Sequence, residues 1–304
     1  MRVNNSGEIL FILGYRAFAK KEIPGLYTSA LSLELLHDFM LVHDDIIDRS
    51  DFRRGKPSMH VILNKYLQRY KNIKFSGEDL SIVAGDIMYA MSIHAFLAAE
   101  TNKANKEKAL KKLMEAAFYT GTGEFIELMY GSRPVGTISK SDIYQIYDLK
   151  TACYTFATPL AAGAILAGSG DKQTNDLFNY GICLGRAFQI KDDILGIFGE
   201  QKKIGKSLMA DLREHKKTLL IWYAYNNADR QGKILIKELM SKRDCTMNDL
   251  LQLRKLMSKT ETLRFAENEI SKLIHKADSI LENTHMQIKY KNMLYEYSKD
   301  ILSV

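Results

Sequence analysis

The sequence contains few residues that cross-link or interrupt a chain. Its 304 residues include three cysteines, Cys153, Cys183 and Cys245, which are widely spaced and form no Cys-x-x-Cys pair. This pattern excludes a disulfide framework and favours reduced thiols in a cytosolic protein. Only 4 prolines and 19 glycines occur, while 46% of the residues are hydrophobic. We therefore expect a large core built mainly from helices.

Long apolar runs are missing as well. Residues 9–13 form an apolar stretch that is too short for the core of a signal peptide. The longest apolar run, about residues 156–167, is shorter than the roughly 18 residues that cross a bilayer. We therefore predict no transmembrane segment and a cytoplasmic location. A hydrophobic substrate would have to be held in a pocket inside the fold.

The charges show no concentrated basic tract. The 43 basic and 36 acidic residues give a net charge of +7, which favours anionic partners in general. There is no arginine-rich run, no zinc-finger spacing and no aromatic-basic nucleic-acid motif. We therefore predict no nucleic-acid partner and favour a small molecule that carries phosphate.

Apolar residues recur every three or four positions through much of the chain, as at Leu31, Leu35 and Phe39, while alternating strand-like stretches are scarce. This period predicts amphipathic helices. No linker divides the sequence, so we expect a single all-α domain over residues 1–304, with a polar surface loop at residues 71–79. The predicted helices cover about residues 8–20, 25–48, 57–70, 78–100, 105–131, 139–168, 173–199, 212–228, 230–241, 247–258, 260–282 and 285–302.

Two near-copies of one short pattern lie within these helices: residues 42–48 read VHDDIID and residues 190–196 read IKDDILG. On a helix Asp44 and Asp48 share a face, with roughly 6 Å between their Cβ atoms, and Asp45 lies about 100° round from Asp44. Two carboxylates 4 Å apart repel by on the order of 4 kcal/mol at an effective dielectric of about 20, so the cluster needs protonation or a cation. Oxygen ligands without a neighbouring cysteine suit Mg²⁺, which completes its shell with water and substrate phosphate.

Basic and polar residues accompany both patterns. Arg53 and Arg54 follow the first, and guanidinium groups can bind phosphate bidentately. The alternative is a solvent-exposed helix end with ion pairs, although adjacent aspartates within an apolar run are unusual at an exposed surface. Gln189 shares the carboxylate face of Asp192 and Asp193, a pattern that alone is also typical of an ordinary helix face. Two such patterns far apart in sequence can face each other across a cavity.

Other candidates have structural alternatives. Lys150, followed by Thr151, interrupts an apolar helix, and its alternative is a surface lysine with a buried stem. Lys206 and Lys216 lie in and beyond a glycine-rich stretch, where single lysines are usually exposed. His37 lies two helical turns before the first aspartate, and a lone helical histidine is usually structural.

These motifs, in this order along the chain, resemble those of the trans-type isoprenyl diphosphate synthases. Residues 37–57 look like the first aspartate-rich region of that family, and residues 188–193 look like the second. The family also keeps a Lys-Thr pair, a loop lysine and a later lysine, at places that here hold Lys150-Thr151, Gly205-Lys206 and residues 211–218. The resemblance covers about residues 9–225.

This resemblance implies an orthogonal helical bundle around a deep central cavity, and a homodimer. It implies a transferase that condenses isopentenyl diphosphate with an allylic prenyl diphosphate. Three Mg²⁺ ions would bridge the allylic diphosphate from the catalytic aspartates Asp44, Asp45, Asp48, Asp192 and Asp193. The substrate-binding residues would be Arg53, Lys150, Thr151, Gln189, Lys206 and Lys216 for the allylic diphosphate, with Lys150 also catalytic, and His37 and Arg54 for isopentenyl diphosphate.

Two departures from the family pattern leave alternatives open. Residues 2–8 lack the lysine and the Arg-Pro that the family uses for isopentenyl diphosphate, and Gly196 stands where the second motif often ends in aspartate. One alternative is therefore a catalytically weakened partner subunit of a heteromeric prenyl synthase. The other is a class I terpene cyclase, although that class would place serine or threonine at position 196.

The resemblance also bears on product length. In the family, a bulky aromatic residue five positions before the first aspartate, with no insertion in the motif, accompanies a twenty-carbon product. Phe39 occupies that position and Met40 follows it. On a helix Phe39 lies about 140° round from Asp44, whereas Met40 lies nearly beneath it. We therefore favour geranylgeranyl diphosphate as the product.

Overall fold

Helices make up nearly all of the regular structure in the computed structural model, which describes residues 6–53, 55–199, 215–242 and 244–302. In chain order they are α1 (Ser6–Arg16), α2 (Leu26–Ile47), α3 (Met59–Leu67), α4 (Gly77–Phe96), α5 (Lys103–Gly131), η2 (Val135–Thr137), α6 (Lys140–Tyr147), η3 (Asp148–Ala157), α7 (Thr158–Leu166), α8 (Asp171–Phe198), α11 (Leu219–Asn227), α12 (Arg230–Leu239), α13 (Met247–Lys259), α14 (Thr262–Asn283) and α15 (Ile288–Leu302). The predicted all-α class is confirmed. Within these ranges, no helix combines the length and the apolar character needed to cross a membrane.

A short hairpin follows α2. Its strands β1 (Phe52–Arg53) and β2 (Lys56–Pro57) are antiparallel, with Phe52 opposite Pro57 and Arg53 opposite Lys56. The hairpin turns the chain back toward the end of α2, and this return brings Arg53 beside the aspartates there. The sequence predicted the break from its glycine and proline, but it did not predict paired strands.

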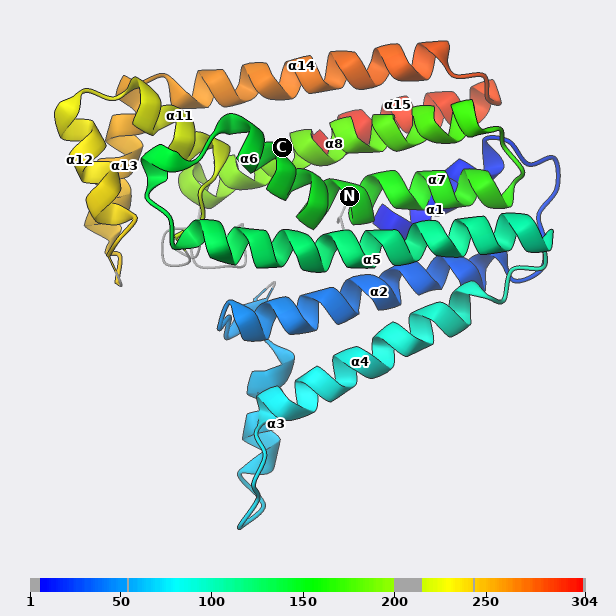
Figure 1. The fold of residues 1–304 in the computed structure, drawn as a ribbon, viewed down its shortest axis with the longest axis horizontal. Coiled ribbons are helices and arrows are strands. Elements are labelled where there is room, and N and C mark those ends of the chain that lie inside the picture. Colours follow the sequence, from blue (N-terminus) through cyan, green and yellow to red (C-terminus); the bar gives the residue numbers. More distant parts are fainter. Residues whose placement is uncertain (1–5, 54, 200–214, 243, 303–304) are drawn as a thin grey trace.

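The long helices run side by side along the long axis of the molecule (Figure 1). Helix α14 packs on α8, α8 and α5 both pack on η3 and α7, and α2 packs on α4. Helices α11, α12 and α13 gather at one end of the bundle (Figure 1). Helix α3 projects outward from the bundle beside the start of α4 (Figure 1). The segment η3 therefore packs on both α5 and α8, and α8 carries the second aspartate motif.

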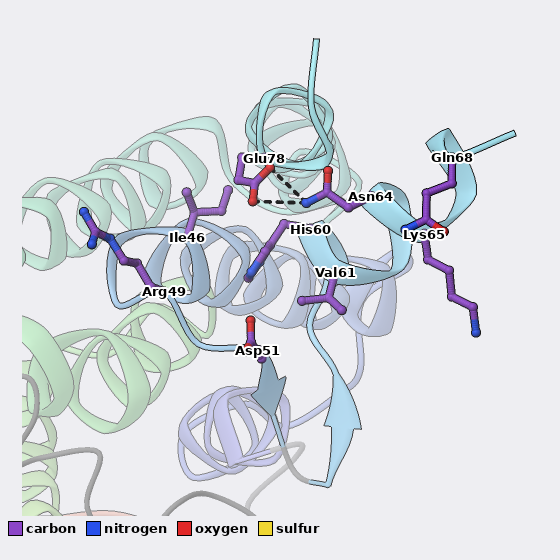
Figure 2. A pocket seen from close by; sticks show the side chains of 9 residues that line it. All are labelled: Ile46, Arg49, Asp51, His60, Val61, Asn64, Lys65, Gln68 and Glu78. Carbon is purple, nitrogen blue, oxygen red and sulfur yellow. Dashed lines mark hydrogen bonds between the residues drawn. The ribbon is translucent and has the colours of Figure 1, made fainter. Parts of the chain in front are cut away.

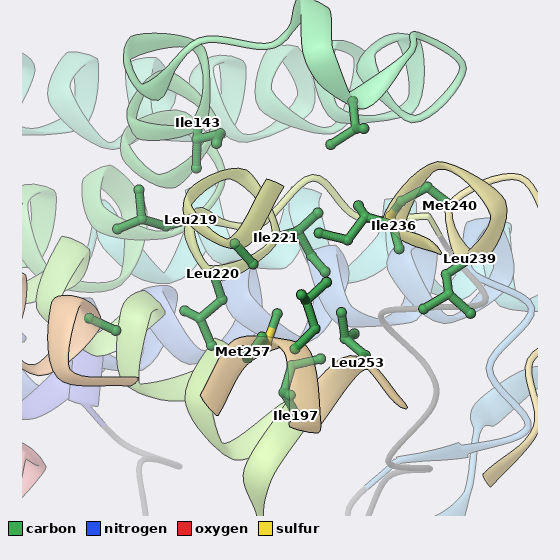
Figure 3. Close-up of a cluster of buried hydrophobic side chains, with 14 of the residues drawn as sticks. Ile143, Ile197, Leu219, Leu220, Ile221, Ile236, Leu239, Met240, Leu253 and Met257 are labelled. Carbon is green, nitrogen blue, oxygen red and sulfur yellow. The ribbon is translucent and has the colours of Figure 1, made fainter. Parts of the chain in front are cut away.

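A cluster of buried aliphatic side chains holds the end of α8 against α6, α11, α12 and α13 (Figure 3). Ile197 from α8, Ile143 from α6 and Leu220 from α11 are at most 1% exposed. Burying one such side chain contributes about 1.5–3 kcal/mol. The cluster therefore fixes the start of α11 relative to the second aspartate motif. Lys216 lies in the segment just before that start.

Two differences in helix boundaries and one in helix type separate the structure from the predicted helices at places that bear on the site. Helix α1 ends at Arg16 rather than 20, where the Tyr15 hydroxyl donates to the Lys21 carbonyl oxygen at 2.9 Å and the chain turns. In the described part of the predicted helix 212–228, the helix begins only at Leu219, because the Thr218 side chain caps it by accepting from the Ile221 N–H at 3.3 Å. The third difference is inside the predicted helix 139–168.

That segment is helical without interruption from α6 through η3 to α7, but the type of helix changes along it. Its middle, η3, is a π-helix of 10 residues between α6 and α7. A π-helix is wider than an α-helix, forms i→i+5 hydrogen bonds, and is frequently found at functional sites. Apolar periodicity does not readily reveal this change, because side chains four positions apart lie near the same face in both forms. Lys150 and Thr151 lie in this π-helical segment.

Candidate functional site

The first aspartate motif forms the last turn of α2. Asp44 and Asp45 are helical, and Asp48 caps the helix with its N–H donating to the Asp44 carbonyl oxygen at 2.8 Å. A helix C-terminus carries partial negative charge, so three carboxylates at this position repel both one another and the helix end. Asp45 is only 5% exposed, which limits relief by water. The carboxylates of this motif therefore need protonation or neighbouring cations, the two alternatives that the sequence left open.

Arg53 supplies one of these cations. Its Nη2 donates to Asp44 Oδ2 and its Nε donates to Asp45 Oδ1, both at 2.7 Å. The structure thus places Arg53 at the predicted site, where it binds two carboxylates at once. The neighbouring Arg54, predicted to bind isopentenyl diphosphate, lies outside the described residues.

Lys150 lies among three carboxylates. Its Nζ lies 2.5 Å from Glu127 Oε2, 2.6 Å from Glu124 Oε2 and 3.3 Å from Asp44 Oδ1, and its side chain is 19% exposed. Burial alone would lower the pKa of Lys150, but Glu127 and Asp44 outweigh this effect and the pKa lies above its ordinary value. The alternative of a surface lysine is therefore wrong.

Glu124 and Glu127 were not predicted from the sequence. They lie one turn apart on α5, and Gly123 lets α5 approach η3, since a Cβ at position 123 would lie 2.8 Å from the Lys150 backbone nitrogen. The available signal was two glutamates three residues apart in a helix. Such a pair is common on exposed helix faces, so the sequence alone did not mark it as part of a site.

Three of these carboxylates can share a cation. Ligand oxygens of Asp44, Asp48 and Glu124 all lie within 4.8 Å of one another. Burial raises the pKa of Asp48 and of Glu124, although Lys216 opposes the shift at Asp48 and Lys150 opposes it at Glu124. Charged carboxylates are thus disfavoured here without further positive charge. Glu124 Oε1 is also buried without a hydrogen-bond partner.

The second aspartate motif is anchored to η3. Asp193 is 4% exposed and accepts hydrogen bonds from the Tyr147 hydroxyl and from Gln189 Nε2, the latter at 3.1 Å. Gln189 Oε1 in turn accepts from Thr151 Oγ1 at 2.8 Å. Thr151, Gln189 and Asp193 therefore form one chain of hydrogen bonds. Asp192 is exposed beside them.

Tyr147 was not predicted. Burial, followed by the adjacent Asp193 carboxylate, raises its pKa well above the ordinary value, so it remains an O–H donor. Its oxygen also accepts the Leu219 N–H at 2.9 Å. Tyr147 therefore ties Asp193 to the start of α11. Lys216, just before α11, approaches Asp48 Oδ2 to 3.4 Å.

The two aspartate motifs are linked through residues 147–151. Lys150 contacts Asp44 of the first motif, while Tyr147 and Thr151 bind Asp193 and Gln189 of the second. Arg53, Lys150 and Lys216 are thus brought to the carboxylates as predicted. Lys206 and residues 2–5 lie outside the described residues.

The remaining candidates lie on α2, on the turns before the aspartates. His37 Nδ1 lies 3.2 Å from the Tyr154 hydroxyl of η3, and the two rings are stacked. Phe39 packs on Tyr89 of α4 and on His43, with ring centroids 5.1 Å and 4.8 Å apart. Met40 is half-buried. Phe39 therefore lies in the α2–α4 contact rather than directly beneath Asp44.

A separate pocket lies on the other side of the end of α2, between α3 and the start of α4 (Figure 2). Its volume is about 720 Å³, and its lining residues are Ile46, Arg49, Asp51, His60, Val61, Asn64, Lys65, Gln68 and Glu78. None of these residues was predicted to bind substrate or metal. The pocket is therefore distinct from the carboxylate cluster.

Comparison with known proteins agrees with this geometry. The family model described as polyprenyl synthetase matches residues 7–257. A short chain isoprenyl diphosphate synthase from Methanocaldococcus jannaschii is 30% identical over 225 residues, which cover 74% of this chain and 63% of that protein. A geranylgeranyl diphosphate synthase from Saccharolobus solfataricus is 30% identical over 259 residues, covering 84% and 72% of the two chains. A geranylfarnesyl diphosphate synthase from Aeropyrum pernix is 31% identical over 255 residues, covering 83% and 74%.

Solved structures share the fold over nearly the whole chain. Geranylgeranyl pyrophosphate synthase from Corynebacterium glutamicum, in complex with isoprenyl diphosphate and magnesium, superposes with a TM-score of 0.88 at 24% identity, covering 98% of this chain and 86% of that one. Polyprenyl synthase from Caulobacter crescentus, in complex with calcium and isoprenyl diphosphate, gives 0.85 at 26% identity, covering 99% and 84%.

Proposed function

The chain belongs to the polyprenyl synthetase family of trans-prenyltransferases, and from this premise we propose that it condenses isopentenyl diphosphate with an allylic prenyl diphosphate. The observation that carries the proposal is the meeting of Asp44, Asp48 and Glu124 with Lys150 in one cluster. Carboxylates that hold metal, next to cations that bind phosphate, are the requirements of a diphosphate site.

The residues present fit Mg²⁺. Asp44, Asp48 and Glu124 offer oxygen ligands from two helices, and the Lys150 ammonium already lies beside two of them, as a cation would. The Caulobacter and Corynebacterium structures contain a divalent cation together with isoprenyl diphosphate. We propose that this site takes three Mg²⁺ ions with substrate bound, with Asp45, Asp192 and Asp193 as the further ligands.

The chemistry follows from where charge develops. Breaking the allylic carbon–oxygen bond leaves new negative charge on the diphosphate, and bound metal would stabilise that charge as a Lewis acid. Arg53, Lys150 and Lys216 each contact a carboxylate of the first motif and can also bind diphosphate oxygens there. Such contacts stabilise the transition state more than the ground state, because the charge is larger in the transition state.

The second step joins the allylic cation to the double bond of isopentenyl diphosphate. We propose that His37 and Arg54 help to hold that substrate. The released diphosphate can accept the proton lost in the condensation, so no separate side-chain base is required. Thr151 and Tyr147 hold Gln189 and Asp193 in fixed positions, which limits reorganisation during ionisation.

Glu124 is expected to be a metal ligand in addition to the aspartates. Glu124→Gln should weaken binding of Mn²⁺, used as a spectroscopic substitute for Mg²⁺, by at least about tenfold, the lower end of the range seen when even a residue that only supports a metal ligand is changed. Electron paramagnetic resonance of free Mn²⁺ measures this without substrate turnover. The matched control is Glu127→Gln, which also removes a carboxylate from Lys150 but lies outside the close oxygen triplet. Equal weakening by both variants would show a general charge effect and contradict a ligand role for Glu124.

We propose geranylgeranyl diphosphate as the product. Phe39→Ala should lengthen it by one or two isoprene units, because it removes a ring that fills space between α2 and α4. The products are measured by mass spectrometry of the dephosphorylated alcohols. Leu31→Ala, an exposed position two turns earlier on α2, is the control and should leave the product unchanged. An unchanged product in Phe39→Ala would remove the length assignment.

One assay separates this proposal from its alternatives. The protein is incubated with Mg²⁺, farnesyl diphosphate and labelled isopentenyl diphosphate, and the products are extracted. Label in a longer prenyl alcohol after dephosphorylation supports the synthase. Diphosphate binding without incorporation supports a partner subunit of a heteromeric synthase, and an unlabelled hydrocarbon supports a terpene cyclase.

We also propose that the chain forms a homodimer through α4 and α5. Val83, Ile87 and Met91 repeat every four residues on α4 and are more than half exposed, and Phe118 and Phe125 of α5 are exposed even more. Contiguous exposed apolar side chains of this kind mark interaction surfaces. Light scattering after size-exclusion chromatography tests the proposal, and a monomeric mass would contradict it.

A further inference from the structure

The outward projection built from residues 59–76, comprising α3 and the turn after it, is not explained by the proposed reaction. It extends from the bundle beside the start of α4 (Figure 1). The sequence predicted a helix over residues 57–70 and a polar surface loop over residues 71–79. From here on we call residues 59–76 the α3 projection.

The surface of the α3 projection combines basic and apolar side chains. Lys65, Arg69, Lys71 and Lys74 are all exposed, and residues 59–77 contain no aspartate or glutamate. Large apolar and aromatic side chains lie between these charges and are 37–55% exposed: Ile62 55%, Tyr66 48%, Tyr70 52%, Ile73 37% and Phe75 46%. A segment that only contacts water would not require any of these five exposed apolar or aromatic side chains.

The base of the α3 projection is firmly built. Asn64 Oδ1 accepts the Gly77 N–H at 2.6 Å, and Asn64 Nδ2 donates to Glu78 at 3.0 and 3.1 Å (Figure 2). Gly77 lies so close to α3 that a Cβ there would lie 2.3 Å from the His60 carbonyl oxygen. Ser76 and Asp79 cap α4 reciprocally. The side chains beyond this base are therefore presented by a defined framework.

The exposed aromatic residues are also ordered. The hydroxyl groups of Tyr66 and Tyr70 lie 2.9 Å apart, and the Arg69 guanidinium lies 5.5 Å from the centre of the Tyr66 ring. Asn72 has a φ of 61°, a left-handed conformation that asparagine tolerates better than most residues, and it reverses the chain at the tip. Tyrosine, lysine and arginine together are typical of segments at a membrane–water interface, where the ring body is apolar and the tip is polar.

We propose that the α3 projection docks this protein on the surface of an anionic lipid bilayer. Four cations without a compensating acid complement anionic headgroups, and the exposed Ile73 and Phe75 can enter the headgroup region. The exposed aliphatic Ile62 and Ile73 favour a lipid surface over a nucleic acid, which stacks on aromatic rings and contacts cations. The benefit of docking at a membrane rests on the proposed function, because a prenyl diphosphate carries a long hydrocarbon chain that partitions into lipid.

The test is sedimentation of the full-length chain with vesicles of phosphatidylcholine, with and without phosphatidylserine, at about 0.15 M salt. Binding should require phosphatidylserine and weaken as salt is raised. The variant Lys71→Gln/Lys74→Gln should lower the partition coefficient by about 25-fold, or about fivefold for each basic residue removed. Ile73→Ser/Phe75→Ser should also reduce binding. The matched control is Lys20→Gln/Lys21→Gln, two exposed lysines on the loop after α1, which should bind like the parent chain.

Several results would overturn the proposal. These are no binding to anionic vesicles, equal losses in the control pair, tighter binding to RNA than to vesicles, or a change of oligomeric mass in the Ile73→Ser/Phe75→Ser variant. Activity on farnesyl diphosphate without vesicles is measured in parallel, and the α3 projection variants should retain it. If the parent chain does not bind vesicles but retains synthesis, the docking proposal alone is contradicted. If the parent chain binds vesicles but shows no synthesis, the proposed function alone is contradicted.

Discussion

Asp44→Asn is expected to lower kcat by at least about 10²–10³-fold, the range seen when one preorganised charge-stabilising group is removed. Asp44 contacts more of the site than any single role would need. Its carboxylate binds Arg53 at 2.7 Å and lies 3.3 Å from Lys150. One of its oxygens also lies within 4.8 Å of ligand oxygens of Asp48 and Glu124. Asparagine keeps the volume and one acceptor oxygen but removes the charge. Both metal affinity and the alignment of two cations should therefore decrease together.

The measurement is steady-state turnover with labelled isopentenyl diphosphate over a range of Mg²⁺ concentrations. Circular dichroism should show an unchanged helical signal, because Asp44 lies in the last turn of α2 and is not part of the hydrophobic core. Asp86→Asn on α4 is the control, since its side chain is 70% exposed and its Oδ1 lies as far as 3.9 Å from His43 Nε2. Turnover in Asp44→Asn equal to that of the control would remove the assignment of the first aspartate motif.

Much of the candidate site could be predicted because its signal is local. Asp44, Asp48 and Arg53 are close in sequence, and the helical period places the two carboxylates on one face before any tertiary contact is known. The helices themselves follow from apolar periodicity. Lys150 and Gln189 required a resemblance to a family, since a lysine or a glutamine on an amphipathic helix is uninformative by itself.

The rest of the site depends on tertiary contacts. Glu124 reaches Lys150 only because Gly123 permits close packing of α5 on η3, and a helical pattern cannot show which helices will be in contact. Tyr147 carries no distinguishing signal in the sequence, and its hydroxyl acquires a role only when Asp193 and the Leu219 N–H approach it. The π-helical winding of η3 likewise arises from packing against two helices, which a single-chain period does not record.

Lys150→Met is expected to reduce both stability and activity. The variant leaves Asp44, Glu124 and Glu127 facing one another without the ammonium that lies within 3.3 Å of each. Removing one partner of a buried ion pair costs about 3–5 kcal/mol, and the 19% exposure of Lys150 places the expected loss near the lower value. Urea unfolding followed by circular dichroism measures the free energy of unfolding, and turnover should become undetectable because a diphosphate-binding cation is lost.

A second variant separates the two effects. Lys150→Met/Glu127→Gln removes the cation and one of its three carboxylates, so it should recover part of the stability while remaining inactive. Millimolar Mg²⁺ should raise the Tm of Lys150→Met by more than it raises the Tm of the parent chain, because the metal binds the folded state at carboxylates that no longer have the ammonium. An equal Mg²⁺ response in the two proteins would mean that the ammonium and the metal do not compete for these oxygens. Recovered activity in the double variant would mean that Lys150 acts only by neutralising Glu127, and that its role is structural.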